Sequence, residues 1–158
     1  MTTIRNLFDQ TRPIDRQITS VINYAGATED QLDAEIREYE VTDSLARHYE
    51  RLLSNLDQGF NAGAGYEVGV WVSGFYGSGK SSFTKYLGFA FDPKRTVKGE
   101  LFLTRLQNQF PSQGLRQQLS TVAQRHPATV IMLDLASIAG VQSAAQGVSR
   151  LLYDQVMT

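Results

Sequence analysis

One short stretch, from Val70 to Phe83, constrains the fold of this 158-residue chain more than any other. A run rich in β-formers, VWVS, leads into GFYGSGKSS, in which spaced glycines are followed at once by a lysine and two serines. The spacing fits the pattern G-x-x-x-x-G-K-[ST], in which backbone amides and the positive end of a helix hold nucleotide phosphates. In a chain of this length, such a match recurs by chance in roughly one sequence in a few hundred. The stretch therefore predicts a phosphate-binding loop between a strand and a helix.

Each part of this loop has a predicted role. The glycines let the backbone turn tightly and bring its amides up to phosphate oxygens. Lys80 is the predicted catalytic residue, because its ammonium stabilises charge on the β- and γ-phosphates, and the Ser81 hydroxyl is placed to ligate Mg²⁺. Phe75 and Tyr76 either shield the phosphates or pack on a neighbouring subunit. The predicted nucleotide-binding residues are Gly74, Phe75, Tyr76, Gly77, Ser78, Gly79, Lys80, Ser81 and Ser82.

Two segments are predicted to be buried parallel strands, because both of their faces are largely apolar: Tyr66–Ser73 and Thr129–Leu135. Helices are expected from the capping box at Thr28, from Thr42, and over 79–89, 98–110 and the apolar stripe between 115 and 126. A last helix is expected from Val141. The predicted fold class is therefore α/β, a P-loop NTPase-type parallel sheet flanked by helices, with an N-terminal helical region.

The glycine-rich connector DQGFNAGAG predicts a boundary between two regions. Residues 1–60 form the predicted N-terminal helical region, and residues 61–158 form a partial P-loop NTPase domain of the AAA-like kind. A complete core has about five strands, and only two are clear here. We therefore expect an incomplete core, with later strands supplied by a longer parent protein.

Hydrolysis by a P-loop enzyme also needs an acidic residue at the end of a neighbouring strand. Asp134, at the end of VIMLD, is the candidate, but Leu135 follows it where a second acid would stand. We favour the alternative in which Asp134 caps or orients the loop beyond the strand. Arg5, Arg12 and Arg16 are candidates for contact with the nucleotide base, although ordinary surface arginines are the favoured interpretation.

Composition excludes several classes of site and partner. The chain has no cysteine and two histidines, so disulfide frameworks, thiolate metal sites and histidine clusters are not expected. The net charge of −1 gives no electrostatic footprint for nucleic acid, so nothing in the charge balance argues for DNA contact, and we expect DNA to be met only indirectly. The amino terminus lacks a signal-like apolar centre, and no run has the length of a membrane span. A cytoplasmic protein with no membrane contact is predicted.

Three segments in a fixed order resemble the large P-loop ATPases of BREX phage-defence systems, the BrxC family. These are IRNLF…RPIDRQITSVI, then EIREYEVTDSLARHYERLL, then GVWVSGFYGSGKSSFTKYL, and the resemblance runs from Ile4 to about Leu87. It implies an ATP-binding, N-terminal piece of a much longer bacterial protein. It also implies partners among the other BREX components, including the DNA methyltransferase and the alkaline-phosphatase-like protein. Carried over by position, the nucleotide-binding residues are Gly74, Gly77, Gly79, Lys80, Ser81 and Ser82.

The resemblance has limits that bear on catalysis. Ser82 stands where the family pattern most often has histidine, and no Walker-B acid, sensor or arginine finger can be carried over. Our first hypothesis is an ATPase module that binds Mg·ATP and has little turnover of its own. The second is a homo-oligomerisation or partner-docking module gated by nucleotide. A third, a small P-loop phosphotransferase, would need a lid with clustered arginines, whereas the arginines here are scattered.

Overall fold

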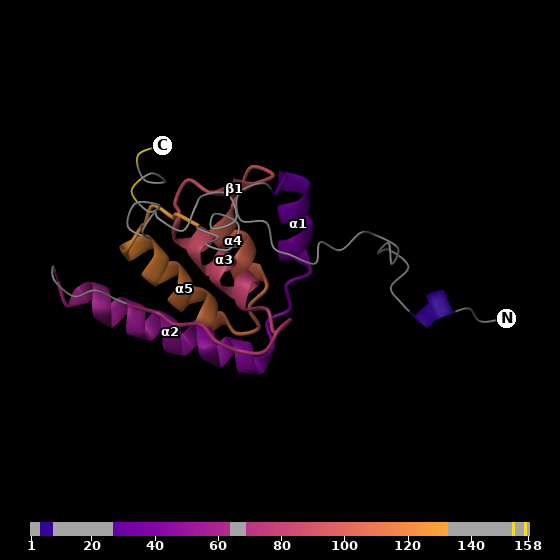
Figure 1. Ribbon diagram of the computed structural model, residues 1–158, viewed down its shortest axis with the longest axis horizontal. Coiled ribbons are helices and arrows are strands. Elements are labelled where there is room, and N and C mark those ends of the chain that lie inside the picture. Colours follow the sequence, from indigo (N-terminus) through magenta and orange to yellow (C-terminus); the bar gives the residue numbers. More distant parts are fainter. Residues whose placement is uncertain (1–3, 8–26, 64–68, 133–152, 154–156, 158) are drawn as a thin grey trace, which may run out of the picture.

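The computed structural model describes residues 4–7, 27–63, 69–132, 153 and 157 (Figure 1). These residues form a helical bundle with one short hairpin, and the 3₁₀ helix η1 (Ile4–Leu7) stands apart from it. None of the described helices is long and apolar enough to cross a bilayer. The elements of the bundle are α1 (Glu29–Arg37), α2 (Asp43–Asn61), α3 (Lys80–Phe91), β1 (Thr96–Val97), β2 (Glu100–Leu101), α4 (Phe102–Asn108) and α5 (Gln113–Arg125).

The predicted parallel sheet is wrong. The sheet in the described part of the chain is the antiparallel pair β1–β2, in which Thr96 lies opposite Leu101 and Val97 opposite Glu100. The described residues of both predicted strands, 69–73 and 129–132, belong to no strand. The fold is therefore mostly helical, and the described residues contain no P-loop NTPase core.

Neither of the two predicted strands forms, and backbone pairing and side-chain exposure explain why. A strand exists only when a neighbour accepts and donates its backbone hydrogen bonds, whatever its side chains prefer. The run 70–72 has no such neighbour in the described residues, and Trp71 is 91% exposed. Val130 and Met132 lie instead against Gly88 of α3. The run 129–132 therefore packs on α3 through its side chains without forming a strand.

The predicted helix starts at Thr28 and Thr42 are confirmed. The Thr28 hydroxyl accepts a hydrogen bond from the Gln31 amide at 3.3 Å, and the Gln31 side chain accepts one from the Thr28 amide at 2.9 Å. The Thr42 hydroxyl likewise accepts from the Leu45 amide at 3.3 Å. Each cap satisfies amide donors that the first helical turn leaves unpaired. Local sequence alone therefore sets where α1 and α2 begin.

The predicted helix over 98–110 is wrong at its beginning. Lys98 and Gly99 have φ values of +53° and +76° and form the turn of the β1–β2 hairpin. A two-residue hairpin turn with both φ values positive matches the twist of the flanking strands. The helix α4 therefore begins only at Phe102.

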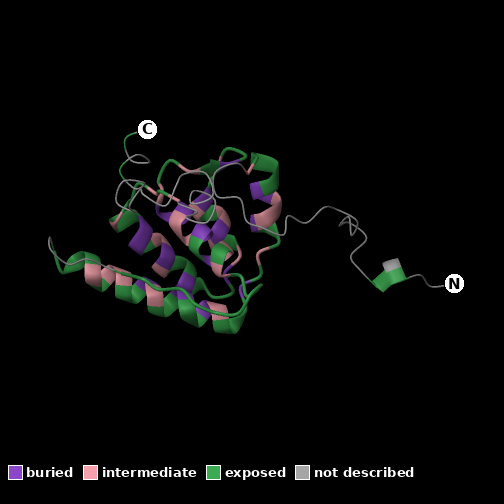
Figure 2. Ribbon diagram, viewed as in Figure 1, coloured by how far each residue is buried: buried purple, intermediate pink, exposed green. Residues whose placement is uncertain are grey.

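Tyr49 of α2 lies at the centre of the core. Its ring centroid is 4.6 Å from that of Phe83 in α3 and 4.8 Å from that of Phe110, which follows α4. Its hydroxyl is 3.0 Å from the Tyr39 hydroxyl. Figure 2 shows buried residues on the facing sides of α3, α4 and α5. The buried core residues are Leu32, Ile36, Val41, Ala46, Tyr49, Leu53, Phe83, Tyr86, Phe89, Ala90, Phe91, Val97, Phe102, Leu106, Phe110, Leu115, Leu119, Val122 and Ala123.

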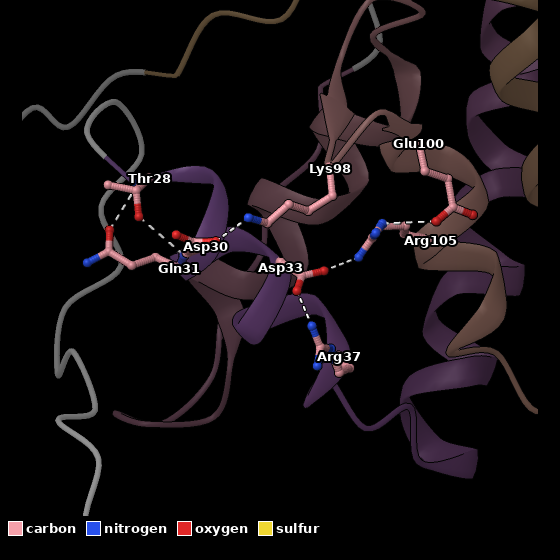
Figure 3. A network of polar contacts seen from close by, with 8 residues as sticks. All are labelled: Thr28, Asp30, Gln31, Asp33, Arg37, Lys98, Glu100 and Arg105. Carbon is pink, nitrogen blue, oxygen red and sulfur yellow. Dashed lines mark hydrogen bonds and ion pairs between the residues drawn. The ribbon is translucent and has the colours of Figure 1, made fainter. Parts of the chain in front are cut away.

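A network of ion pairs holds α1 against the hairpin and α4 (Figure 3). Asp33, buried, accepts hydrogen bonds from Arg37 on its own helix and from Arg105 of α4. The Nε atom of Arg105 lies 3.0 Å from a Glu100 carboxylate oxygen. Burial works to raise the pKa of Asp33, but the hydrogen bonds and charges of Arg37 and Arg105 outweigh it, and the pKa lies below its ordinary value.

A second ion pair joins α1 to α3 through a fully buried lysine. The Lys85 ammonium donates to a Glu35 carboxylate oxygen at 2.7 Å, and the lysine side chain has no exposed surface. The Tyr86 hydroxyl also donates to Glu35 at 3.4 Å. A buried ammonium without an anionic partner would be strongly destabilising, so Glu35 holds α1 in place.

Glu35→Gln should lower the free energy of unfolding by about 3 kcal/mol, because it leaves the Lys85 charge buried without a counter-charge. Asp30→Asn, which breaks the exposed pair with Lys98, is the matched control and should cost about 1 kcal/mol or less. Chemical denaturation of both variants measures the difference. Equal losses in the two would contradict the structural role given to Glu35.

Asp33 should make the protein less stable in acid. The pKa of Asp33 in the folded protein lies below its ordinary value of 3.8. The ionised carboxylate therefore makes its full contribution to the free energy of unfolding above pH 3.8, and this contribution is lost as the pH falls through the folded-state pKa. Denaturation of wild type and Asp33→Asn between about pH 5 and pH 2 tests this. The stability gap between the two should narrow toward low pH. A gap that stays constant across this range would contradict the assignment.

Candidate functional site

The glycine loop before α3 has a backbone that only glycine adopts readily. Gly77 and Gly79 have φ values of +76° and +80°, and Gly79 is the N-cap of α3. A Cβ atom at Gly74 would lie 2.9 Å from the Ser78 hydroxyl oxygen. The left-handed backbone at Gly77 and Gly79, together with the close approach of Gly74 to Ser78, folds the chain back toward the start of α3.

Most amide groups of this loop have no acceptor among the residues that the structure describes. Ser78 donates its amide to the Phe75 carbonyl at 3.2 Å, and Phe83 donates to Gly79 at 2.9 Å as the first bond of α3. The amides of Gly77 and of residues 79–82 have no acceptor in the described part of the chain. Free amides at a helix start carry partial positive charge, which attracts anions. The loop therefore presents a set of donors suited to phosphate oxygens.

The Lys80 side chain folds back over the loop. Its ammonium donates to the Phe75 carbonyl oxygen at 2.6 Å. This bond spans the loop and sets a full positive charge beside the free amides. A phosphate would compete with one neutral carbonyl for that ammonium, and bonds between charged groups are the stronger ones.

The loop forms one wall of an open cavity of about 810 Å³, and the N-terminal half of α2 forms the other. Four polar residues of α2 line it at helical spacing: Ser44, His48, Arg51 and Asn55. They occupy one face of the helix, while Ala46, Tyr49 and Leu53 face the core. The remaining lining residues are Tyr39, Glu40, Thr42, Leu45, Leu52, Val70, Trp71, Val72, Ser73, Gly74, Phe75, Gly77, Ser78, Gly79, Lys80 and Phe83.

The charges around this cavity favour an anion. Lys80 and Arg51 are its cationic lining residues, and Glu40 is the single acid among the described residues that line it. Burial raises the pKa of the Tyr39 phenol, partly offset by its hydrogen bond with Tyr49, so the hydroxyl stays protonated at neutral pH. No cluster of metal-ligating side chains occurs in the described ranges. An anionic ligand fits this cavity better than a bare metal ion.

The predicted site residues divide between this cavity and its surroundings. Gly74, Phe75, Gly77, Ser78, Gly79 and Lys80 line it, whereas Tyr76, Ser81 and Ser82 do not. Phe75 and Tyr76 are 91% and 97% exposed. Asp134, Arg12, Arg16 and the predicted helix from Val141 lie outside the described residues. Arg5 belongs to η1, which stands away from the loop (Figure 1).

Sequence reasoning missed the polar face of α2. The predicted site residues include neither His48 nor Arg51. The spacing of Ser44, His48, Arg51 and Asn55 is a readable signal, because residues four, three and four apart share a helix face. What the spacing could not indicate is that this face lies opposite the glycine loop.

A second, smaller cavity of about 440 Å³ lies between α2 and α5. Beside it Asp57 pairs with Arg125 at 2.9 Å and with the His126 ring at 3.0 Å. The hydrogen bond from His126 lowers the pKa of the Asp57 carboxyl, with help from Arg125. These bonds join α2 to the end of α5, and we give them a structural role.

No protein-family model matches this chain, and no solved structure is significantly similar to it. The geometry of the loop and the cavity therefore carries the functional argument.

Gly79→Ala should lower the free energy of unfolding by about 1 kcal/mol, because a side chain at positive φ is strained. Gly114→Ala is the matched control: it lies within α5 at ordinary φ with open space around it, and should raise stability by up to about 1 kcal/mol. Thermal or chemical denaturation gives both values. A neutral or stabilising Gly79→Ala would show that α3 does not need the left-handed cap.

Proposed function

We propose that residues 74–82 bind the triphosphate of Mg·ATP, and that this chain is the N-terminal portion of a BREX-type defence ATPase. The amides of Gly77 and residues 79–82 bind phosphate oxygens, and Lys80 neutralises charge on the β- and γ-phosphates. The Ser81 hydroxyl would hold Mg²⁺ together with phosphate oxygens, because Mg²⁺ prefers hard oxygen ligands. The protein acts in the bacterial cytoplasm beside the methyltransferase and phosphatase-like BREX components, and meets DNA only through them.

The observation that supports this proposal most is the place of the Lys80 ammonium. It lies 2.6 Å from the Phe75 carbonyl, beside amides that have no acceptor in the described residues, and it lines the cavity. Glycine-rich loops that lead into a helix with lysine at its first position bind phosphates through these same groups. The resemblance of Ile4 to about Leu87 to the BREX ATPases agrees with this ligand.

The proposal is for binding, with little or no hydrolysis by these 158 residues alone. Attack by water on the γ-phosphate needs a residue that positions the water and a carboxylate beside the metal. Glu40 is the one acid in the described cavity lining, and it lies on the segment before α2 rather than on the phosphate loop. Hydrolysis in the BREX ATPase accordingly depends on other parts of the parent protein.

The alternative function, a nucleotide-gated assembly or docking module, has one observation in its favour. Trp71, Phe75 and Tyr76 are each more than nine-tenths exposed, and they lie just before the phosphate loop or within it. Large exposed aromatic side chains are enriched at protein–protein contacts. Bound nucleotide would then act as a switch for oligomerisation or partner binding.

Lys80→Ala should weaken Mg·ATP binding at least about tenfold, because a hydrogen bond between charged groups contributes about 1.5–3 kcal/mol. Titration with a fluorescent ATP analogue measures the affinity. Lys94→Ala is the matched control, since it removes an exposed lysine charge that does not line the cavity. Equal affinity of wild type and Lys80→Ala would reject the site.

Light scattering with and without Mg·ATP, together with phosphate release, separates the two functions. A chain that binds ATP and stays monomeric with and without it agrees with the phosphate site acting alone. An oligomer that appears only with Mg·ATP and releases no phosphate favours the assembly alternative, in which bound nucleotide is the switch.

A further inference from the structure

The polar face of α2 lines the same cavity as the phosphate loop, and it carries an arginine with no partner among the described residues. Ser44, His48, Arg51 and Asn55 follow one another along this face and all line the cavity. Arg51 is exposed and forms no ion pair or hydrogen bond with any described residue. A guanidinium is therefore available opposite Lys80.

Most other described arginines of the bundle already have contacts. Arg37, Arg105 and Arg125 form ion pairs, Arg116 donates to the Phe110 carbonyl, and Arg95 stacks on the Phe89 ring at 4.2 Å. Within the described bundle, Arg47 and Arg51 are the two without such a partner. They lie on the same helix, but only Arg51 lines the cavity.

The size of the cavity indicates how large a ligand can bind between the loop and α2. Its volume of about 810 Å³ is that of a site for a nucleotide-sized molecule, far more than one phosphate ion occupies. Lys80 and the loop amides contact the ligand from one side only. A chain of phosphates leaves other oxygens facing α2, where a planar guanidinium can bind two of them at once.

We propose that Arg51 is a second phosphate-binding residue, which holds the outer phosphates of the ligand from the opposite wall and selects triphosphates over monophosphates. This inference rests on the proposed function of the loop, which supplies the first set of contacts. The His48 ring, one turn earlier on the same face, adds a hydrogen-bond donor or acceptor beside the guanidinium. The ligand class is a nucleoside triphosphate held between α2 and the start of α3.

The test compares Arg51→Ala, Arg51→Lys and the matched control Arg47→Ala, with Mg·ATP and AMP as probes. Competition against a fluorescent ATP analogue measures each affinity in the intact chain. Arg51→Ala should weaken Mg·ATP binding about tenfold or more and leave AMP binding within about twofold. Arg47→Ala should stay within about twofold for both probes. The affinity of Arg51→Lys for Mg·ATP should lie between those of wild type and Arg51→Ala, because an ammonium keeps the charge but cannot form two parallel hydrogen bonds.

Each outcome decides something distinct. If Lys80→Ala abolishes Mg·ATP binding while Arg51→Ala has the same affinities as Arg47→Ala, Arg51 does not bind the ligand. The phosphate loop then remains the proposed site. If Arg51→Ala weakens Mg·ATP and AMP equally, the residue does not read the outer phosphates and the inference falls. If wild type binds no nucleotide, the proposed function itself falls. Unfolding midpoints identify any loss of fold in Arg51→Ala, in which case the Arg51→Lys affinities decide.

Discussion

The packing of Tyr49 against Phe83 is the contact on which the rest of the candidate site depends. Tyr49 is fully buried on the inner face of α2, and Phe83 lies in the first turn of α3, directly after the glycine loop. This contact joins the helix that carries Arg51 to the helix that begins with Lys80. Both of these residues line the same cavity.

The loop combines left-handed glycines with backbone amides that have no acceptor among the described residues. Gly77 and Gly79 have positive φ values, and the amides of Gly77 and residues 79–82 are the donors that an anion can bind. Water can satisfy these donors, so no large penalty is stored in the free protein. An anion replaces that water with charge-assisted bonds from the amides and Lys80, which is how such loops gain affinity for phosphates.

Local signals predicted the helices well and the strands badly, and the difference has a physical cause. The caps at Thr28 and Thr42 act through bonds three residues apart, so their effect is written in the sequence. The apolar stripe of α5 is confirmed in the same way, since Leu115, Leu119, Val122 and Ala123 are all buried. Strands need partners far away in the chain, and apolar runs at 70–72 and 129–132 indicate a preference without naming a partner. The hairpin at Lys98 and Gly99 was missed because lysine seldom adopts positive φ.

The sequence by itself determined where α1 and α2 begin, which face of α5 is buried, and that a glycine loop with lysine stands at the head of α3. Those features depend on residues within a few positions of one another, whose bonds form whatever the rest of the chain does. Only the tertiary structure decided that the fold is a helical bundle rather than a sheet, and that Arg51 and the loop line one cavity. Both follow from packing between segments distant in sequence, such as Tyr49 on Phe83, which no local pattern encodes.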